Sequence, residues 1–86
     1  MASSTYSVFY HSPDGFFVCR TDFLDLEKAE DFLQTKVFIF GGAKFHFILK
    51  DGKTLVKGEP RERTEKFYAE SMRYAVEIPE SEINRF

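Results

Sequence analysis

Two segments of the chain have the apolar spacing of β-hairpins, and each is followed by a segment with helical spacing. Residues 6–11 are rich in aromatic and β-branched side chains, and residues 16–21 resume this pattern after Ser12-Pro13-Asp14-Gly15. Proline at the second position and glycine at the last position favour a β-turn. The pattern therefore predicts a first hairpin made of residues 6–11 and 16–21.

The period changes over residues 22–36, where Leu26, Ala29 and Leu33 recur at helical intervals among charged residues. Asp25 is positioned as an N-cap, and Lys36 suits the negative end of the helix dipole. We expect an amphipathic helix here. The apolar residues 37–40 then end at two glycines, and they are either a further short strand or an apolar loop.

Residues 43–50 alternate strictly, with Phe45, Phe47 and Leu49 on one side and more polar residues on the other. Asp51-Gly52 is a strong signal for a two-residue hairpin turn. Residues 54–57 are then the partner strand. The sequence predicts a second hairpin at this position.

A second helix is expected over residues 61–76, with Pro60 suited to its first position and Ile78-Pro79 ending it. Residues 78–86 are expected to form a tail or a short helix, and residues 1–4 a disordered N-terminus. The whole chain, residues 1–86, is the size of one small domain.

These segments predict an α+β fold with ββ-α-ββ-α order. We expect an antiparallel sheet of four to five strands, with both helices packed on one face. The other face of such a sheet is usually polar. Here it is not, since Ile48 shares its side of the strand with His46, and Phe9 alternates with neighbours that are also apolar.

The composition strengthens this point, because 11 Phe and 4 Tyr are many rings for an 86-residue chain. A chain of this size has a thin core. We therefore expect some rings to look outward, where an exposed apolar patch marks an interaction site. The residues predicted for this surface are Phe9, Phe16, Arg20, Phe38, Phe40, Lys44, His46 and Ile48.

Charge and cysteine content indicate the class of protein. The net charge of −2 lacks the basic excess typical of nucleic-acid or membrane binding. Cys19 is the only cysteine, which excludes an intrachain disulfide, and the first residues do not read as a signal peptide. The longest apolar run, residues 37–40, is too short for a membrane span. We expect a cytoplasmic protein that has no membrane contact.

Candidate chemistry is sparse. Cys19 with His46 or His11 is the one thiol–imidazole combination, and nothing in the spacing brings them together. The histidines lack metal-ligand spacing. Gly41-Gly42 precedes a strand rather than the helix that a phosphate loop needs. We predict no catalytic, metal-binding or cofactor-binding residue, and therefore no enzyme.

The sequence favours a small non-enzymatic binding or regulatory module that acts through protein–protein contacts. The partner would be another protein or a second copy, and we expect a homodimer formed through the sheet. One alternative is single-stranded nucleic-acid binding on an aromatic and basic sheet face. Another is a small-ligand pocket or an enzyme that uses Cys19 and His46.

Overall fold

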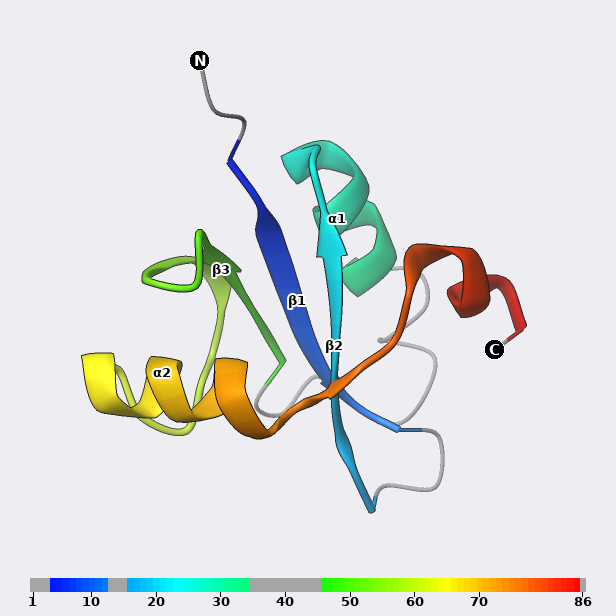
Figure 1. Cartoon of the computed structure of the whole chain (residues 1–86). Coiled ribbons are helices and arrows are strands. Elements are labelled where there is room, and N and C mark those ends of the chain that lie inside the picture. Colours follow the sequence, from blue (N-terminus) through cyan, green and yellow to red (C-terminus); the bar gives the residue numbers. More distant parts are fainter. Residues whose placement is uncertain (1–3, 13–15, 35–45, 86) are drawn as a thin grey trace.

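The computed structural model describes residues 4–12, 16–34 and 46–85, and every structural statement below concerns these residues. They form, in chain order, β1 (Tyr6–His11), β2 (Val18–Phe23), α1 (Leu26–Phe32), β3 (Phe47–Lys50), β4 (Thr54–Gly58), α2 (Glu65–Tyr74), β5 (Val76–Glu77) and the 3₁₀ helix η3 (Glu80–Arg85) (Figure 1). The predicted ββ-α-ββ-α order is confirmed. Residues 37–40, predicted as either a strand or an apolar loop, lie outside the described residues, as do residues 1–3 of the expected N-terminal tail 1–4.

The five strands form one sheet in the order β4-β3-β1-β2-β5. β1 pairs antiparallel with both β2 and β3, whereas β5 pairs parallel with β2 and places Val76 opposite Cys19. The sheet is therefore mixed, and the prediction of a purely antiparallel sheet is wrong. The chain returns to β2 only after passing through α1, the second hairpin and α2, and a long crossover of this kind permits a parallel strand.

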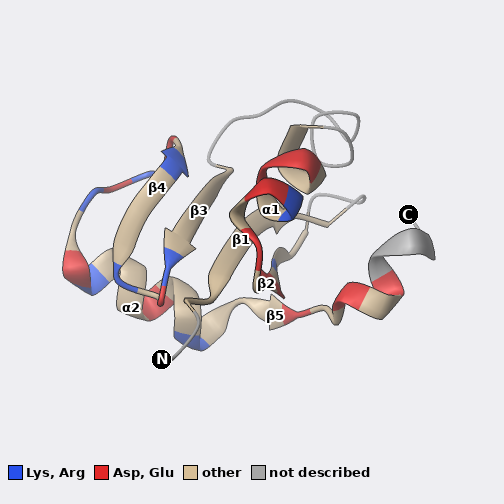
Figure 2. Ribbon diagram, turned by 90° about the horizontal axis from the view of Figure 1, so that it is seen from above, with Lys and Arg blue, Asp and Glu red and all other residues tan. Residues whose placement is uncertain are grey.

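The two helices pack on opposite faces of the sheet, so the prediction that both share one face is also wrong (Figure 2). Residues Ala29 and Phe32 of α1 join a cluster with Val8, Tyr10, Cys19, Phe23 and Ile48. Tyr68 of α2 joins a separate cluster with Phe9, Phe47 and Leu49. The result is a helix–sheet–helix arrangement in three layers.

β1 explains why both faces need a helix. It is the central strand of the sheet, and Ser7–Tyr10 are all buried. Val8 and Tyr10 contact the α1 layer, while Phe9 contacts the α2 layer. A strand covered on both faces loses the alternation of a half-exposed strand. The run Val8-Phe9-Tyr10 was therefore the signature of a doubly covered strand rather than of surplus rings.

α1 begins where the sequence predicts. The Asp25 carboxylate accepts a hydrogen bond of 2.9 Å from the Glu27 N–H and caps the helix. The Phe32 ring packs edge-on against Tyr10, with ring centroids 5.1 Å apart, and also contacts Phe23. On the other side, the Glu30 carboxylate lies 3.7 Å from the Lys57 ammonium of β4. These contacts hold the short helix across β1 and β2.

α2 begins four residues later than predicted, at Glu65, with Thr64 as its N-cap. The Thr64 hydroxyl accepts a hydrogen bond of 3.1 Å from the Phe67 N–H. The residues between Pro60 and Thr64 are charged and exposed. They have no apolar face to bury, and packing of such a face is what stabilises most protein helices. The capping threonine therefore sets the start instead of Pro60.

The turn between β3 and β4 follows the Asp51-Gly52 prediction. Both residues have positive φ, 54° and 71°, and the Lys53 N–H donates to the Lys50 carbonyl at 3.1 Å. Gly58 ends β4 with a φ of 96°, and a Cβ there would overlap the backbone of His46. This close approach of β4 to the start of β3 requires glycine.

Candidate functional site: an aromatic groove beside α2

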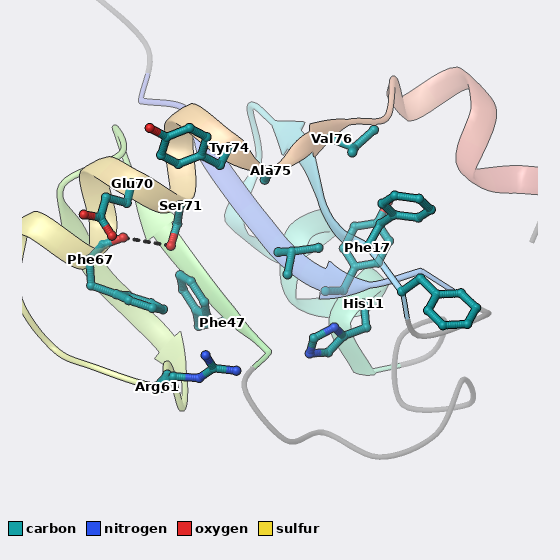
Figure 3. A pocket seen from close by; sticks show the side chains of 13 residues that line it. His11, Phe17, Phe47, Arg61, Phe67, Glu70, Ser71, Tyr74, Ala75 and Val76 are labelled. Carbon is teal, nitrogen blue, oxygen red and sulfur yellow. Dashed lines mark hydrogen bonds between the residues drawn. The ribbon is translucent and has the colours of Figure 1, made fainter.

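A groove of about 360 Å³ lies on the α2 side of the sheet, where α2 meets β5 and the end of the β1–β2 hairpin (Figure 3). Tyr10, His11, Phe16, Phe17 and Val18 line it from the hairpin. The lining residues from the rest of the described chain are Phe47, Arg61, Phe67, Glu70, Ser71, Tyr74, Ala75 and Val76. The hairpin, β3, α2 and β5 therefore all contribute aromatic or aliphatic side chains to one hollow.

The groove collects most of the exposed apolar surface. Six large apolar side chains of the described residues are exposed, and five of them line it: Phe16, Phe17, Val18, Tyr74 and Val76. The exception is Leu24, at the other end of β2. Scattered exposed apolar residues are ordinary, whereas a gathered patch indicates an interaction site.

The placement of the helices explains the exposure. α2 packs on β1, β3 and β4 through Phe9, Phe47, Leu49 and Leu55. It does not extend over the start of β2, so Val18 is left 44% exposed and Phe17 56% exposed. The sequence analysis placed Phe16 and Phe17 in the return strand, but β2 begins only at Val18. These two rings therefore project from the end of the hairpin instead of entering the sheet.

Arg20 holds the α2 and β5 walls of the groove in place. Its Nη1 donates a hydrogen bond of 2.8 Å to the Met72 carbonyl in the last turn of α2. Its Nε lies 3.3 Å from an Asp22 carboxylate oxygen, and its Nη2 lies 3.6 Å from Glu77 of β5. Asp22 also accepts a bond of 2.6 Å from the Ser7 hydroxyl.

We predicted Arg20 as part of an interaction surface, and the structure shows its guanidinium packed against its own chain. Its side chain is only 15% exposed and is engaged with three elements of its own chain. The β1–β2 register places Arg20 opposite Phe9, on the face that α2 covers. The guanidinium therefore supports the groove from within.

The polar groups of the groove are few. The Ser71 hydroxyl donates to the Phe67 carbonyl at 2.8 Å, within α2, as the dashed line in Figure 3 marks. The hydroxyl proton of Ser71 is therefore already engaged in a hydrogen bond within α2. Arg61 and Glu70 are both exposed on the lining. The groove thus has an apolar floor with two charged side chains, Arg61 and Glu70, on its lining.

His46 lies next to the groove residue His11, with the ring centroids 5.7 Å apart. It is 5% exposed, and neither ring nitrogen has a hydrogen-bond partner. Burial, and then the nearby His11, lower the pKa of His46, so its imidazole is neutral at neutral pH. We predicted His46 on the outer surface. Its backbone instead packs against Gly58, and its carbonyl accepts from the Glu59 N–H at 3.0 Å.

Phe9 and Ile48 were also predicted on the outer surface and are fully buried. Phe9 stacks on Phe47 at 4.7 Å under α2, and Ile48 belongs to the α1 cluster. The helix on each face covers them. Of the predicted surface residues, Phe16 is exposed as expected, at 83%. Phe38, Phe40 and Lys44 lie outside the described residues.

Of the residues considered for chemistry, His11 lines the groove, whereas Cys19 and His46 do not. The Cys19 side chain is buried in the α1 cluster and faces away from the hollow. The Tyr10 hydroxyl shares a buried 2.8 Å hydrogen bond with Thr21, and burial raises its pKa to about 12. Within the described ranges no three His, Cys, Asp or Glu side chains gather as metal ligands. None of the helices found there is long and apolar enough to cross a bilayer.

Sequence reasoning missed the α2 and β5 half of the groove. Tyr74 and Val76 fell within the longer helix predicted over residues 61–76, but α2 ends at Tyr74 and both side chains are exposed. The available signal was the Phe16-Phe17 pair directly after a turn, because two adjacent rings in a strand point to opposite faces. Nothing in the sequence placed that pair beside the end of α2.

Comparison with protein-family models, with curated proteins and with solved structures finds no match to this chain.

Proposed function

We propose that this protein is a small non-enzymatic module that binds protein through the aromatic groove between α2, β5 and the β1–β2 hairpin. The observation that carries the proposal is the gathering of five exposed apolar side chains around one hollow. Interface centres are rich in aromatic residues and poor in charged ones, with polar groups at the rim. The groove has this composition.

The size of the hollow fits apolar side chains of a partner. An apolar cavity of about 150 Å³ can bind benzene, so the 360 Å³ groove has room for more than one ring. Phe47 and Phe67 offer ring surfaces in it, with centroids 6.0 Å apart. Aromatic pairs at such separations add to the gain from area burial alone. A partner that inserts one aromatic anchor would therefore use the groove well.

The nucleic-acid alternative has less support. Stacking platforms for single strands need exposed rings beside several basic groups. Phe9, Ile48 and His46, which this hypothesis placed on an open sheet face, are buried. Arg61 is the one Lys or Arg among the described lining residues, and Glu70 lines the same groove. Protein recognition fits this lining better.

A titration with N-acetyl-phenylalaninamide, followed by amide chemical shifts of dilute protein, tests the proposal. We expect weak, saturable binding with the largest shifts at Val18, Ser71 and Ala75. Phe17→Ser should weaken it, because Phe17 contributes an exposed wall. Leu24→Ser is the matched control, since Leu24 is 73% exposed and does not line the groove. Shifts centred near Leu24, or no shifts at millimolar probe, would refute the proposal.

A further inference from the structure

The surface around the groove has both a hollow and a projecting ring. Phe16 is the most exposed of the large apolar side chains, at 83%, and it stands on the wall of the groove. A partner that only fills the hollow leaves Phe16 in water. A partner that fills the hollow and also has a hollow to receive Phe16 would bury both the groove and this ring. A two-fold symmetric pair of identical surfaces meets this condition, because each copy supplies the same ring and the same hollow.

The charges on the lining are also self-complementary. Arg61 and Glu70 are exposed and opposite in sign, and in the view of Figure 3 the Phe47 and Phe67 rings lie between them. When two copies face each other across a two-fold axis, Arg61 of one can meet Glu70 of the other, and the reverse pair follows by symmetry. The net charge of −2 per chain gives only weak repulsion between copies.

We propose that the occupant of the groove is a second copy of this chain: Phe16 of each copy enters the groove of the other, and Arg61 of each faces Glu70 of the other. This inference rests on the proposed function, because it uses the same groove. The sequence predicts a dimer through the sheet, by a face or an edge strand, but α1 and α2 pack on the two faces. The contact surface is instead the end of the hairpin together with the margin of α2.

Sedimentation equilibrium of the full chain over a wide range of concentration tests the dimer. The weight-average mass should rise from 10.1 kDa towards twice that value. Phe16→Asp should weaken the association about tenfold or more, because a carboxylate would have to enter an apolar hollow. Leu24→Asp introduces the same charge at an exposed site away from the groove and should leave it unchanged. Equal effects of the two changes would overturn the inference.

A mixing experiment tests the two-fold pairing of charges. Arg61→Glu alone and Glu70→Arg alone should each weaken the dimer, by about fivefold for exposed pairs. An equimolar mixture of the two variants should associate like the unmodified chain, because each variant then meets opposite charges in the other. An ion pair within one chain would not give this rescue. A mixture as weak as its components would contradict the proposed pairing.

The two proposals fail differently. If the amide probe binds the groove but the chain stays monomeric at every concentration, the groove binds some other protein and the inference is wrong. If the probe does not bind and the chain dimerises regardless of the residue at position 16, both proposals are wrong. Circular dichroism of each variant checks the fold, and Phe16→Ser is a milder second variant if Phe16→Asp does not fold.

Discussion

Both faces of the sheet carry apolar side chains, but the two faces differ in how completely a helix covers these side chains. In the part of the chain that the structure describes, α1 buries its side of the sheet, whereas large apolar side chains stay exposed beside α2. On the α1 face, Val8, Tyr10 and Ile48 are almost completely buried beneath a helix of seven residues. On the α2 face, the helix is longer, at ten residues, but five large apolar side chains remain exposed around the groove. Helix length therefore does not decide closure.

Helix position decides it. α1 lies across β1 and β2, and its buried Ala29 lets the helix approach the sheet closely while Phe32 fills the space beside Tyr10. α2 is displaced towards β3 and β4, and its last turn is tied to β2 by Arg20. Of the described elements, none covers the start of β2 on that side. An open margin of a well-packed core is a common origin of binding surfaces.

The largest expected difference between the two regions is in the stability lost when an aromatic ring is removed from each of them. Phe9→Ala removes a fully buried ring stacked on Phe47 and should lower the free energy of unfolding by about 3–5 kcal/mol. Phe17→Ala removes a ring that is 56% exposed and should cost less than about 1 kcal/mol. Urea denaturation measures both. Similar losses would mean that the groove belongs to a closed core.

Removing the Arg20 guanidinium should destabilise mainly the end of α2 and β5, which form two walls of the groove. Arg20→Met keeps much of the apolar stem but leaves the Met72 carbonyl without its charged donor and Asp22 without its ion-pair partner. Hydrogen bonds to charged groups contribute about 1.5–3 kcal/mol, and we expect a loss of about 2 kcal/mol. Hydrogen exchange should accelerate at the end of α2 and in β5 but not in α1. Uniform acceleration would show that Arg20 supports the whole fold.

The two helix caps offer a matched pair of smaller changes. Asp25→Ala and Thr64→Ala each remove a capping acceptor and should cost about 1 kcal/mol in thermal or urea unfolding. Only Thr64→Ala should also weaken binding of the phenylalaninamide probe, because α2 lines the groove and α1 does not. An equal effect of Asp25→Ala on the probe would place the binding surface elsewhere.

Acid should produce the smallest effect, through His46. The folded pKa of His46 lies below its ordinary value of about 6.5, so the unfolded chain binds the proton more readily. The contribution of neutral His46 to stability is complete above about pH 6.5 and is lost as the pH falls towards the folded pKa. His46→Phe should flatten this slope in unfolding measured between neutral and mildly acidic pH. If His46→Phe left the slope unchanged, the pH dependence of the unfolding free energy would come from other titratable groups.

Local features of the fold could be predicted because each depends on a few neighbouring residues. Asp25 caps α1 because its carboxylate accepts a hydrogen bond from the Glu27 N–H, two residues along the chain. Asp51 and Gly52 adopt positive φ in a tight turn that needs no distant contact. The start of α2 was misplaced for a local reason as well, since Thr64 competes with Pro60 as a start signal. The candidate surface was predicted much less well, with Phe16 exposed and Phe9 and Ile48 buried.

The sequence by itself determined the two hairpins, the two α-helices, their order and the Asp51-Gly52 turn, because these depend on short-range sterics and on apolar period, but it did not predict β5. It also determined that one face of the sheet could not be left to water. Only the tertiary structure decided which helix covers which face, that β5 runs parallel to β2, and that the Phe16-Phe17 pair lies beside Tyr74 and Val76. These outcomes depend on contacts between residues far apart in the chain. The hydrophobic effect is not directional, so a local apolar pattern shows that a side chain will be buried but not which distant element will cover it.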